Sequence, residues 1–224
     1  MLLNIILPIL SVLLGFLVVF ILKPKKPKYL KLLLAFSGAF LLSITVFHFL
    51  PEVYSSNYKN IGLFIMIGIL LQIILEFFSK GAEHGHVHIN KNANVFPWLL
   101  FISLSIHSVL EGIPIEGHNN LIYGIIIHKL PVAIILSTFF LASNVPKSKS
   151  FAFLLLFALM TPLGVFLSAN FSFFDTYYTQ ISAIVIGIFL HISTIILFES
   201  NEGHKFNITK LLTIVSAIVI AYFM

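Results

Sequence analysis

The sequence contains no cysteine and no arginine, and it has few charged residues of either sign. Without cysteine the chain can form neither a disulfide bond nor a thiolate metal site. Charged residues make up 9% of the 224 residues and apolar residues 59%, whereas soluble domains average about 25% charged and 45–50% apolar residues. Together with a mean hydropathy of +1.06, this composition excludes an ordinary soluble domain and predicts an integral membrane protein.

Long apolar runs occupy almost the whole chain. A helix needs about 20 mostly apolar residues to cross a hydrocarbon core of about 30 Å. Runs of suitable length lie near residues 2–22, 29–49, 60–79, 95–117, 120–143, 151–170, 179–198 and 207–224. We therefore expect an all-α integral membrane protein, a bundle of eight transmembrane helices that forms a single domain over residues 1–224. The first run is followed by KPKKPK, a flank typical of a retained helix rather than of a signal peptide.

The lysines are distributed unevenly between the predicted loops. All thirteen basic residues are lysines. With the N-terminus outside, eleven of them lie in or beside cytoplasmic loops, and only Lys59 lies in an outside loop. This positive-inside bias predicts a multi-pass protein of the cell membrane (inner or plasma), with both termini outside the cytoplasm and the 80–94 loop inside it. The lysines line a membrane face and form no groove with interleaved aromatics, so a nucleic-acid partner is excluded and the lipid bilayer is the expected surrounding.

The stretch SIHSVLEG, residues 105–112, places two ionisable groups inside the fourth apolar run. His107 and Glu111 are one helical turn apart and share a face. The short GHNN connection at 117–120 makes the fourth and fifth helices antiparallel neighbours, and counting from it puts Glu111, His128 and His107 roughly 12, 14 and 18 Å deep. Two imidazoles and a carboxylate at one level suit Zn²⁺, Fe²⁺ or Mn²⁺. Because ionisable groups in mid-membrane are costly, we predict a metal or proton site here.

Two prolines lie close to this site in the sequence. Pro114 and Pro131 each remove a backbone donor, which leaves the carbonyls of Leu110 and Ile127 without their helical partner. In a membrane such groups are tolerated where protein or a water-lined cavity satisfies them. The prolines therefore favour a buried or hydrated site at this level.

The chain resembles the ZIP (ZRT/IRT-like) family of divalent-metal transporters. HSVLEG at 107–112 and HKLPVA at 128–133 look like the paired motifs of the fourth and fifth helices of that family, and HFLPE (48–52), TPLG (161–164) and ILFES (196–200) are weaker matches. The resemblance implies a ZIP-like 3+2+3 arrangement with inverted repeats, in which the first three and last three helices are related. It also implies a transporter, not an enzyme, that moves metal into the cytoplasm as one helix group slides or rocks.

The resemblance also implies a ligand set and a substrate. It makes His107, Glu111 and His128 the metal ligands, with Ser108 beside them. Val132 stands where several family members have a carboxylate, and the helix around TPLG supplies none, so one bound ion is the expectation. The substrate is expected to be Zn²⁺, with Fe²⁺, Mn²⁺ and Cd²⁺ as further candidates, and no organic cofactor is implied. A homodimer is left open.

Lys129 requires a separate explanation. It stands where family members place a ligand of a second metal, and at roughly 15 Å from the helix end its ammonium could hardly reach the interface. We expect a buried anionic partner. Two interpretations remain open: a fixed ion pair that locks the fifth helix, or a positive charge that occupies the position of the second ion.

Further polar residues are candidates for the metal pathway. The pathway candidates are His48 and Glu52, which flank the outer end of the second predicted helix, and His191 and Glu199 of the seventh. The candidates for labile metal binding in the 80–94 loop are Glu83, His84, His86 and His88, whose alternate histidines share one side of an extended backbone. Capping, interfacial or solvated roles are the plainer alternative for each set.

Two other functions compete with transport. An intramembrane metal-dependent hydrolase would use histidine and glutamate in zinc chemistry, but it usually carries His-Glu-x-x-His, and the fourth helix has no second histidine. A proton channel or a metal-sensing membrane receptor would also place titratable groups in mid-membrane. Turnover of a peptide or lipid by metal-loaded protein in detergent would favour the hydrolase, and isotope uptake into liposomes separates the channel or receptor from a transporter.

Overall fold

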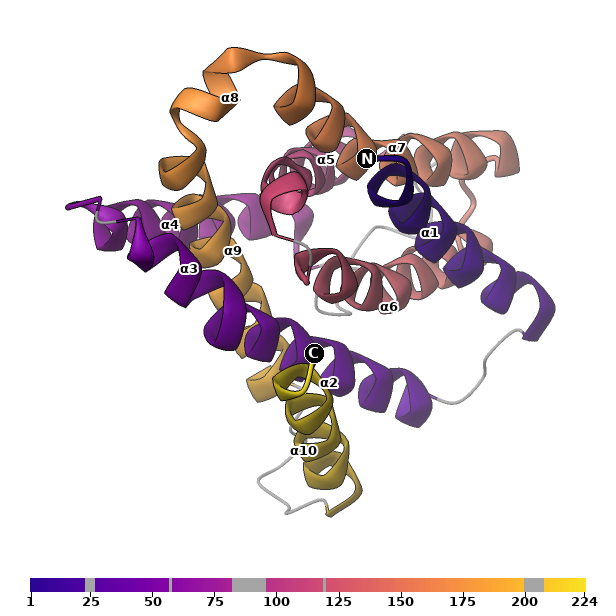
Figure 1. Ribbon diagram of the computed structural model, residues 1–224. Helices are drawn as coiled ribbons and strands as arrows, with labels where there is room; N and C mark the ends of the chain where they lie inside the picture. The colour runs from indigo at the N-terminus through magenta and orange to yellow at the C-terminus, as the bar shows by residue number, and fades with distance from the viewer. Residues whose placement is uncertain (23–26, 57, 82–95, 119, 200–207) are drawn as a thin grey trace.

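The computed structural model describes residues 1–22, 27–56, 58–81, 96–118, 120–199 and 208–224. Every regular element in these ranges is a helix. The helices are α1 (Leu2–Leu22), α2 (Pro27–Ile44), the π-helical segment η1 (Thr45–Phe49), α3 (Leu50–Ser55), α4 (Ile61–Ser79), α5 (Trp98–Gly112), the 3-10 segment η3 (Ile113–Gly117), α6 (Leu121–Ala142), α7 (Lys147–Asn170), α8 (Ser172–Thr176), α9 (Tyr178–Glu199) and α10 (Ile208–Tyr222). The protein is all-α (Figure 1).

Seven stretches in the described residues are long and apolar enough to cross a membrane. They match the first seven predicted runs, with one correction: the second runs to Ser55 instead of ending near residue 49. The predicted eighth run contains α10, which has 15 residues and is shorter than a full span. The structure is that of a multi-pass membrane protein, and an eighth crossing remains an expectation.

The second span is extended through a π-helical turn. Thr45–Phe49 is wound as a π-helix between α2 and α3, so helical backbone continues without a break past Pro51. His48 lies in this turn and Glu52 in the short helix that follows, where we had expected both to flank a helix end. π-Helical turns re-aim the residues after them and often occur at functional positions.

The most extensive pairings divide the helices into two groups, which also contact each other where α2 packs on α6 and α4 packs on α5. In the first, the site group, α1 packs on α6, α5 packs on α7, and α1 also contacts α7. In the second, the flanking group, α4 packs on α9, and α2 packs on both α10 and α9. A separate apolar core lies inside the site group and includes Val12, Leu104, Leu136 and Phe157. The four most extensive pairings are related by an exchange between the two halves of the chain. When α1 is exchanged with α7, α2 with α9, α4 with α10 and α5 with α6, the α1–α6 pair becomes α5–α7 and the α4–α9 pair becomes α2–α10.

The hairpin helices α5 and α6 are neighbours, as predicted, but they meet through side chains and not through closely packed backbones. Across the described residues α5 and α6 are not among the closely packed pairs, and each lies mainly against another helix of the site group. Small residues explain why α6 packs on α1 and α5 on α7: Gly15 of α1 lies against Ala133 of α6, and Gly112 of α5 lies against Gly164 of α7. Such contacts let helix backbones approach closely in membranes. The space between α5 and α6 is therefore left to side chains.

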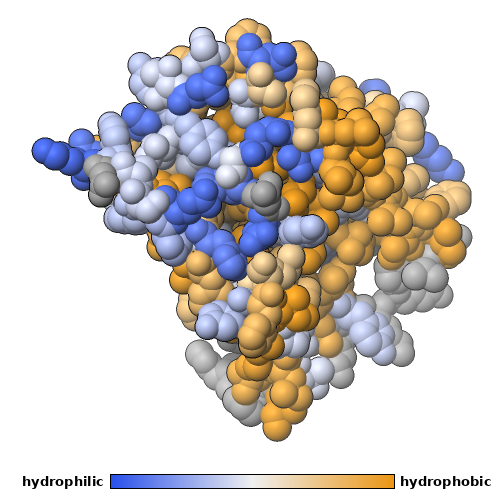
Figure 2. Space-filling view, in the orientation of Figure 1, coloured by the Kyte–Doolittle hydropathy of each residue, from blue (hydrophilic) through white to orange (hydrophobic). Residues whose placement is uncertain are grey.

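Both chain termini lie at the same end of the bundle. The amino group of Met1 is 3.6 Å from Glu116 Oε1, and His48 Nε2 is 3.0 Å from the carbonyl of Ala221. We call this the terminal end; the other end holds Lys80 and Gly81. Figure 2 shows hydrophilic residues gathered over α3 and α8 and hydrophobic residues over the sides formed by α1, α7 and α10. An apolar belt of this kind is the surface that lipid would cover.

Candidate metal centre

His107 and Glu111 lie on the inner face of α5. Both are almost completely buried, and His107 Nε2 is 3.4 Å from Glu111 Oε2. The predicted one-turn spacing on a shared face is confirmed. The carbonyl of Leu110, expected to lack a donor, accepts from the N–H of Ile113 because the helix tightens into η3.

Lys129 of α6 reaches across to this face of α5. Its Nζ is 2.6 Å from Glu111 Oε1, donates to Ser108 Oγ at 3.0 Å and lies 4.5 Å from the centre of the Phe157 ring. Lys129 is only 2% exposed and Glu111 only 1%. The expectation of a buried anionic partner for this lysine is confirmed, and Glu111 is that partner.

Thr161 of α7 is a partner that the sequence did not identify. Its hydroxyl donates to Glu111 Oε1 at 2.6 Å. The contact exists because Gly112 and Gly164 allow α5 and α7 to approach closely, and a Cβ on either would collide with the backbone of the other helix. TPLG is only a weak motif in the sequence, and nothing in it distinguishes a threonine that faces a carboxylate from one that faces lipid.

His128 completes the buried group from α6. Its ring centre is 6.3 Å from that of His107, with the two planes 80° apart. The cavity between the helices measures about 10 Å³ and is lined by His107, Ser108, Glu111, His128 and Lys129, with Leu104, Val132 and Phe157 around them. That volume holds about one water molecule at most. The three predicted ligands and Ser108 therefore line a single cavity, together with Lys129.

The arrangement is not a finished coordination shell. No three His, Asp or Glu side chains in the described ranges are placed so that they could hold one metal ion as they stand. The reason is visible at Glu111, whose Oε1 is occupied by Lys129 and Thr161. Its other oxygen, Oε2, has His107 Nε2 at 3.4 Å as its polar neighbour but forms no hydrogen bond, and His107 Nδ1 is also buried without one. Buried polar atoms are rarely left so, and both are donor atoms suited to a cation.

A hollow of about 440 Å³ opens at the terminal end. His48, Glu52 and His118 line it, and His118 Nδ1 forms an ion-pair contact with Glu52 Oε2. The His118 ring stacks on Tyr178, with centroids 5.8 Å apart, and Tyr178 donates to the Pro114 carbonyl at 3.0 Å. Glu52 of the flanking group and His118 of the η3–α6 connection thus join the two groups.

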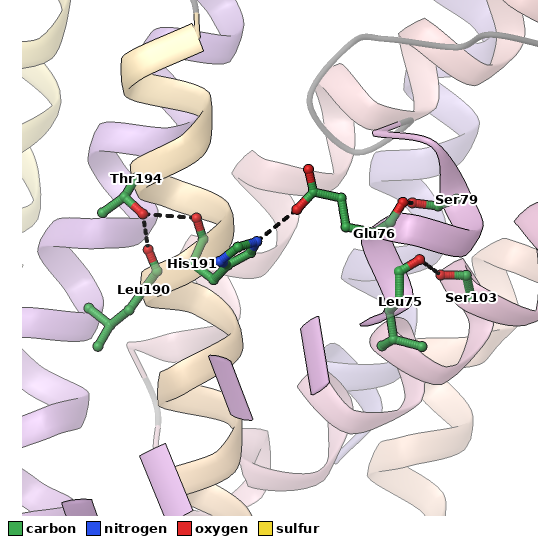
Figure 3. Close-up of polar contacts among 7 residues, drawn as sticks. All are labelled: Leu75, Glu76, Ser79, Ser103, Leu190, His191 and Thr194. Atoms are coloured by element: carbon green, nitrogen blue, oxygen red, sulfur yellow. Dashed lines mark hydrogen bonds and ion pairs between the residues drawn. The ribbon is translucent and has the colours of Figure 1, made fainter. Parts of the chain in front are cut away.

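A second hollow, of about 790 Å³, lies at the opposite end. His191 of α9 and Glu76 of α4 line it, with His191 Nε2 2.7 Å from Glu76 Oε2 (Figure 3). The same view shows Ser103 of α5 donating to the Leu75 carbonyl, which ties α5 to α4. The pathway candidates His48, Glu52 and His191 therefore line hollows at the two ends of the bundle, away from the buried cavity.

Five of the predicted residues cannot be placed. Glu83, His84, His86 and His88 of the 80–94 loop lie outside the described residues, and so does the side chain of Glu199. Their predicted roles in metal binding stay predictions.

No family model matches the chain, and no curated protein matches it. The resemblance to ZIP transporters therefore rests on the motifs alone.

The Thr161 contact predicts a measurable loss of stability. Replacing Thr161 with valine keeps the shape of the side chain and removes one donor from the Glu111 carboxylate, which should lower the free energy of unfolding by about 1–2 kcal/mol. Thermal unfolding in detergent measures the change. Thr138→Val is the matched control because the Thr138 hydroxyl bonds within its own helix, to the Ile134 carbonyl. Equal losses in the two variants would contradict a specific role for Thr161.

Proposed function

We propose that this protein carries a divalent transition-metal ion, Zn²⁺ first, across a cell membrane into the cytoplasm, as the resemblance to ZIP transporters implies. The observation that supports it most is the convergence of His107, Glu111 and His128 on one buried cavity between α5 and α6. Two imidazoles and a carboxylate form a ligand set for Zn²⁺, Fe²⁺ or Mn²⁺ and leave positions for exchange.

The surroundings of the cavity also favour transport. Ionisable side chains within membrane helices usually mark a substrate or ion pathway, and this cavity lies between hollows lined by acidic and imidazole groups at the two ends of the bundle. The exchange of packing partners between the two halves of the chain is the pattern that inverted repeats produce. The site group has an apolar core of its own, although residues of α6 and α7 such as Ile125 and Val165 also pack in the core that contains the flanking group.

In the proposed cycle the ion enters from the terminal end. It exchanges water for Glu52 and the histidines of the first hollow, then for the three ligands of the cavity. The ion pair between Glu111 and Lys129 must weaken for this step, because the ammonium already occupies one of the two carboxylate oxygens. The ion leaves through the hollow at Glu76 and His191. The direction follows from the resemblance and from the lysine bias.

Purified protein in liposomes tests the proposal. Radioactive Zn²⁺ uptake should be saturable and should be inhibited by the other transition metals more than by Mg²⁺ or Ca²⁺. His107→Ala should reduce it by about tenfold or more, since losing an imidazole ligand weakens a metal site strongly. Ser103→Ala, one turn earlier on α5 with its hydroxyl bonded to Leu75, should retain most of the uptake. Uptake no faster than in empty liposomes, or equal in the two variants, would overturn the proposal.

A further inference from the structure

Lys129 is the only lysine among the described residues that is fully buried. Its ammonium has three neighbours: the Glu111 carboxylate, the Ser108 hydroxyl and the face of the Phe157 ring. An isolated ammonium in this environment would be very unfavourable, so the carboxylate is the group that makes its burial tolerable. Glu111 is also the only carboxylate among the predicted metal ligands.

The ammonium and a metal ion therefore require the same carboxylate. Lys129 Nζ lies 2.6 Å from Glu111 Oε1, and a divalent ion would bring a second, larger positive charge to this oxygen pair. Like charges at such a distance repel strongly where the surroundings are apolar. Binding of the metal must then weaken or break the ion pair between Lys129 and Glu111.

Two neighbours of Lys129 can hold its ammonium after it leaves the Glu111 carboxylate. Ser108 Oγ, 3.0 Å away, and the Phe157 ring, 4.5 Å away, can each keep contact with an ammonium that has left the carboxylate. Both lie within reach of the present Nζ position. The lysine can thus withdraw by rotating its side chain while α6 stays in place.

We propose that Lys129 is a tethered counter-ion: it neutralises Glu111 when no metal is bound, withdraws when the metal arrives, and returns when the metal leaves. The proposal rests on the proposed transport function. In the metal-free protein the two charges cancel, so the empty cavity can reorient through the low-dielectric membrane without an unpaired charge. The ion pair thereby serves the return half of the cycle, and it also lowers the affinity for the metal.

Metal binding distinguishes this role from a fixed structural ion pair. Lys129→Met removes the competing charge, and the dissociation constant for Zn²⁺, measured by calorimetry in detergent, should fall about tenfold, a typical coupling between two ligands of one site. Lys129→Gln provides a second neutral variant that keeps one donor for Glu111, in case the methionine variant does not fold. Lys129→Arg keeps the charge and should bind Zn²⁺ with an affinity closer to that of the original protein.

Transport assays separate the two halves of the cycle. In liposomes, the neutral variants should lose net uptake by about tenfold or more, while the exchange of radioactive Zn²⁺ for unlabelled Zn²⁺ across the membrane stays near the original rate. Exchange requires only the metal-loaded cavity to reorient across the membrane, whereas net uptake also requires the empty cavity to return. Lys210→Met is the control, because its ammonium donates to the Leu197 carbonyl in the flanking group, and it should leave the ratio of net uptake to exchange unchanged.

The outcomes are separable. If the original protein binds or transports no metal, the proposed function fails and the role of Lys129 fails with it. If the original protein transports metal but the folded neutral variants bind Zn²⁺ equally well or more weakly, Lys129 is not a competitor and the inference is overturned. Equal losses of net uptake and exchange would also overturn it, because they would indicate a structural ion pair needed at every step.

Discussion

Replacing Glu111 with alanine is expected to lower the free energy of unfolding by about 3–5 kcal/mol, the cost of leaving one charge of a buried pair without its partner. The variant would strand the Lys129 ammonium in a site where only Ser108 and the Phe157 ring remain. It would also leave Thr161 without its acceptor. Thermal or denaturant unfolding in detergent, with a chelator present to exclude any contribution of bound metal, measures this loss.

The double variant Glu111→Ala with Lys129→Met makes this prediction specific. Removing both charges should recover most of the stability, because an apolar pair replaces an ion pair at little cost, whereas metal uptake should remain absent. Glu116→Ala is the matched control: Glu116 lies five residues further on, partly exposed, 3.6 Å from the terminal amine, and a pair of that kind contributes about 1 kcal/mol or less. If the double variant is no more stable than Glu111→Ala alone, the ion pair is not what sustains the cavity.

Replacing Gly164 with alanine is expected to separate α5 from α7 and to cost about 1–3 kcal/mol, as overpacking does. A Cβ at Gly164 would collide with the Val109 carbonyl and come within 3.0 Å of the Gly112 Cα. These are backbone atoms and cannot move without moving a helix. Alanine favours a helix over glycine by about 1 kcal/mol, so the collision must outweigh this gain. Zn²⁺ uptake should also fall, since Thr161 would be drawn away from Glu111.

Gly62→Ala provides the comparison for this substitution. A Cβ at Gly62 would meet only the Tyr54 hydroxyl, at 3.7 Å, so the helix preference alone should act and stability should stay equal or rise by up to about 1 kcal/mol. Unfolding of the two variants in the same detergent measures the difference. A Gly164→Ala variant as stable as Gly62→Ala would mean that the close approach of α5 and α7 is not required.

The buried cavity could be foreseen to the extent that local spacing determines it. His107 and Glu111 share a face because of helical periodicity, and the short connection after them brings His128 to the same level. The depth of Lys129 was enough to predict a buried acidic partner. Each of these inferences uses only the rise of a helix and the length of one turn.

The remaining contacts depend on packing between distant parts of the chain. Thr161 and Phe157 enter the cavity from α7, whose position follows from the approach of Gly112 to Gly164. The sequence around a glycine in an apolar run does not indicate which helix packs against it. The short connection predicts that the hairpin helices are neighbours, but it does not determine how closely their backbones approach. They face each other across His107, Glu111 and Lys129, because α1 and α7 offer small residues to their backbones.

At the π-helical turn Thr45–Phe49, the number of residues matters more than their identity for the direction in which Glu52 points. An α-helix advances roughly 100° per residue, so deleting one residue here would swing Glu52 by about that angle around the helix axis and remove its carboxylate from His118. Substitutions at most of these positions would leave the direction of the Glu52 side chain unchanged. Homologous chains that conserve the spacing between this turn and the acidic residue would keep the same charge at the entrance even where the residues of the turn differ.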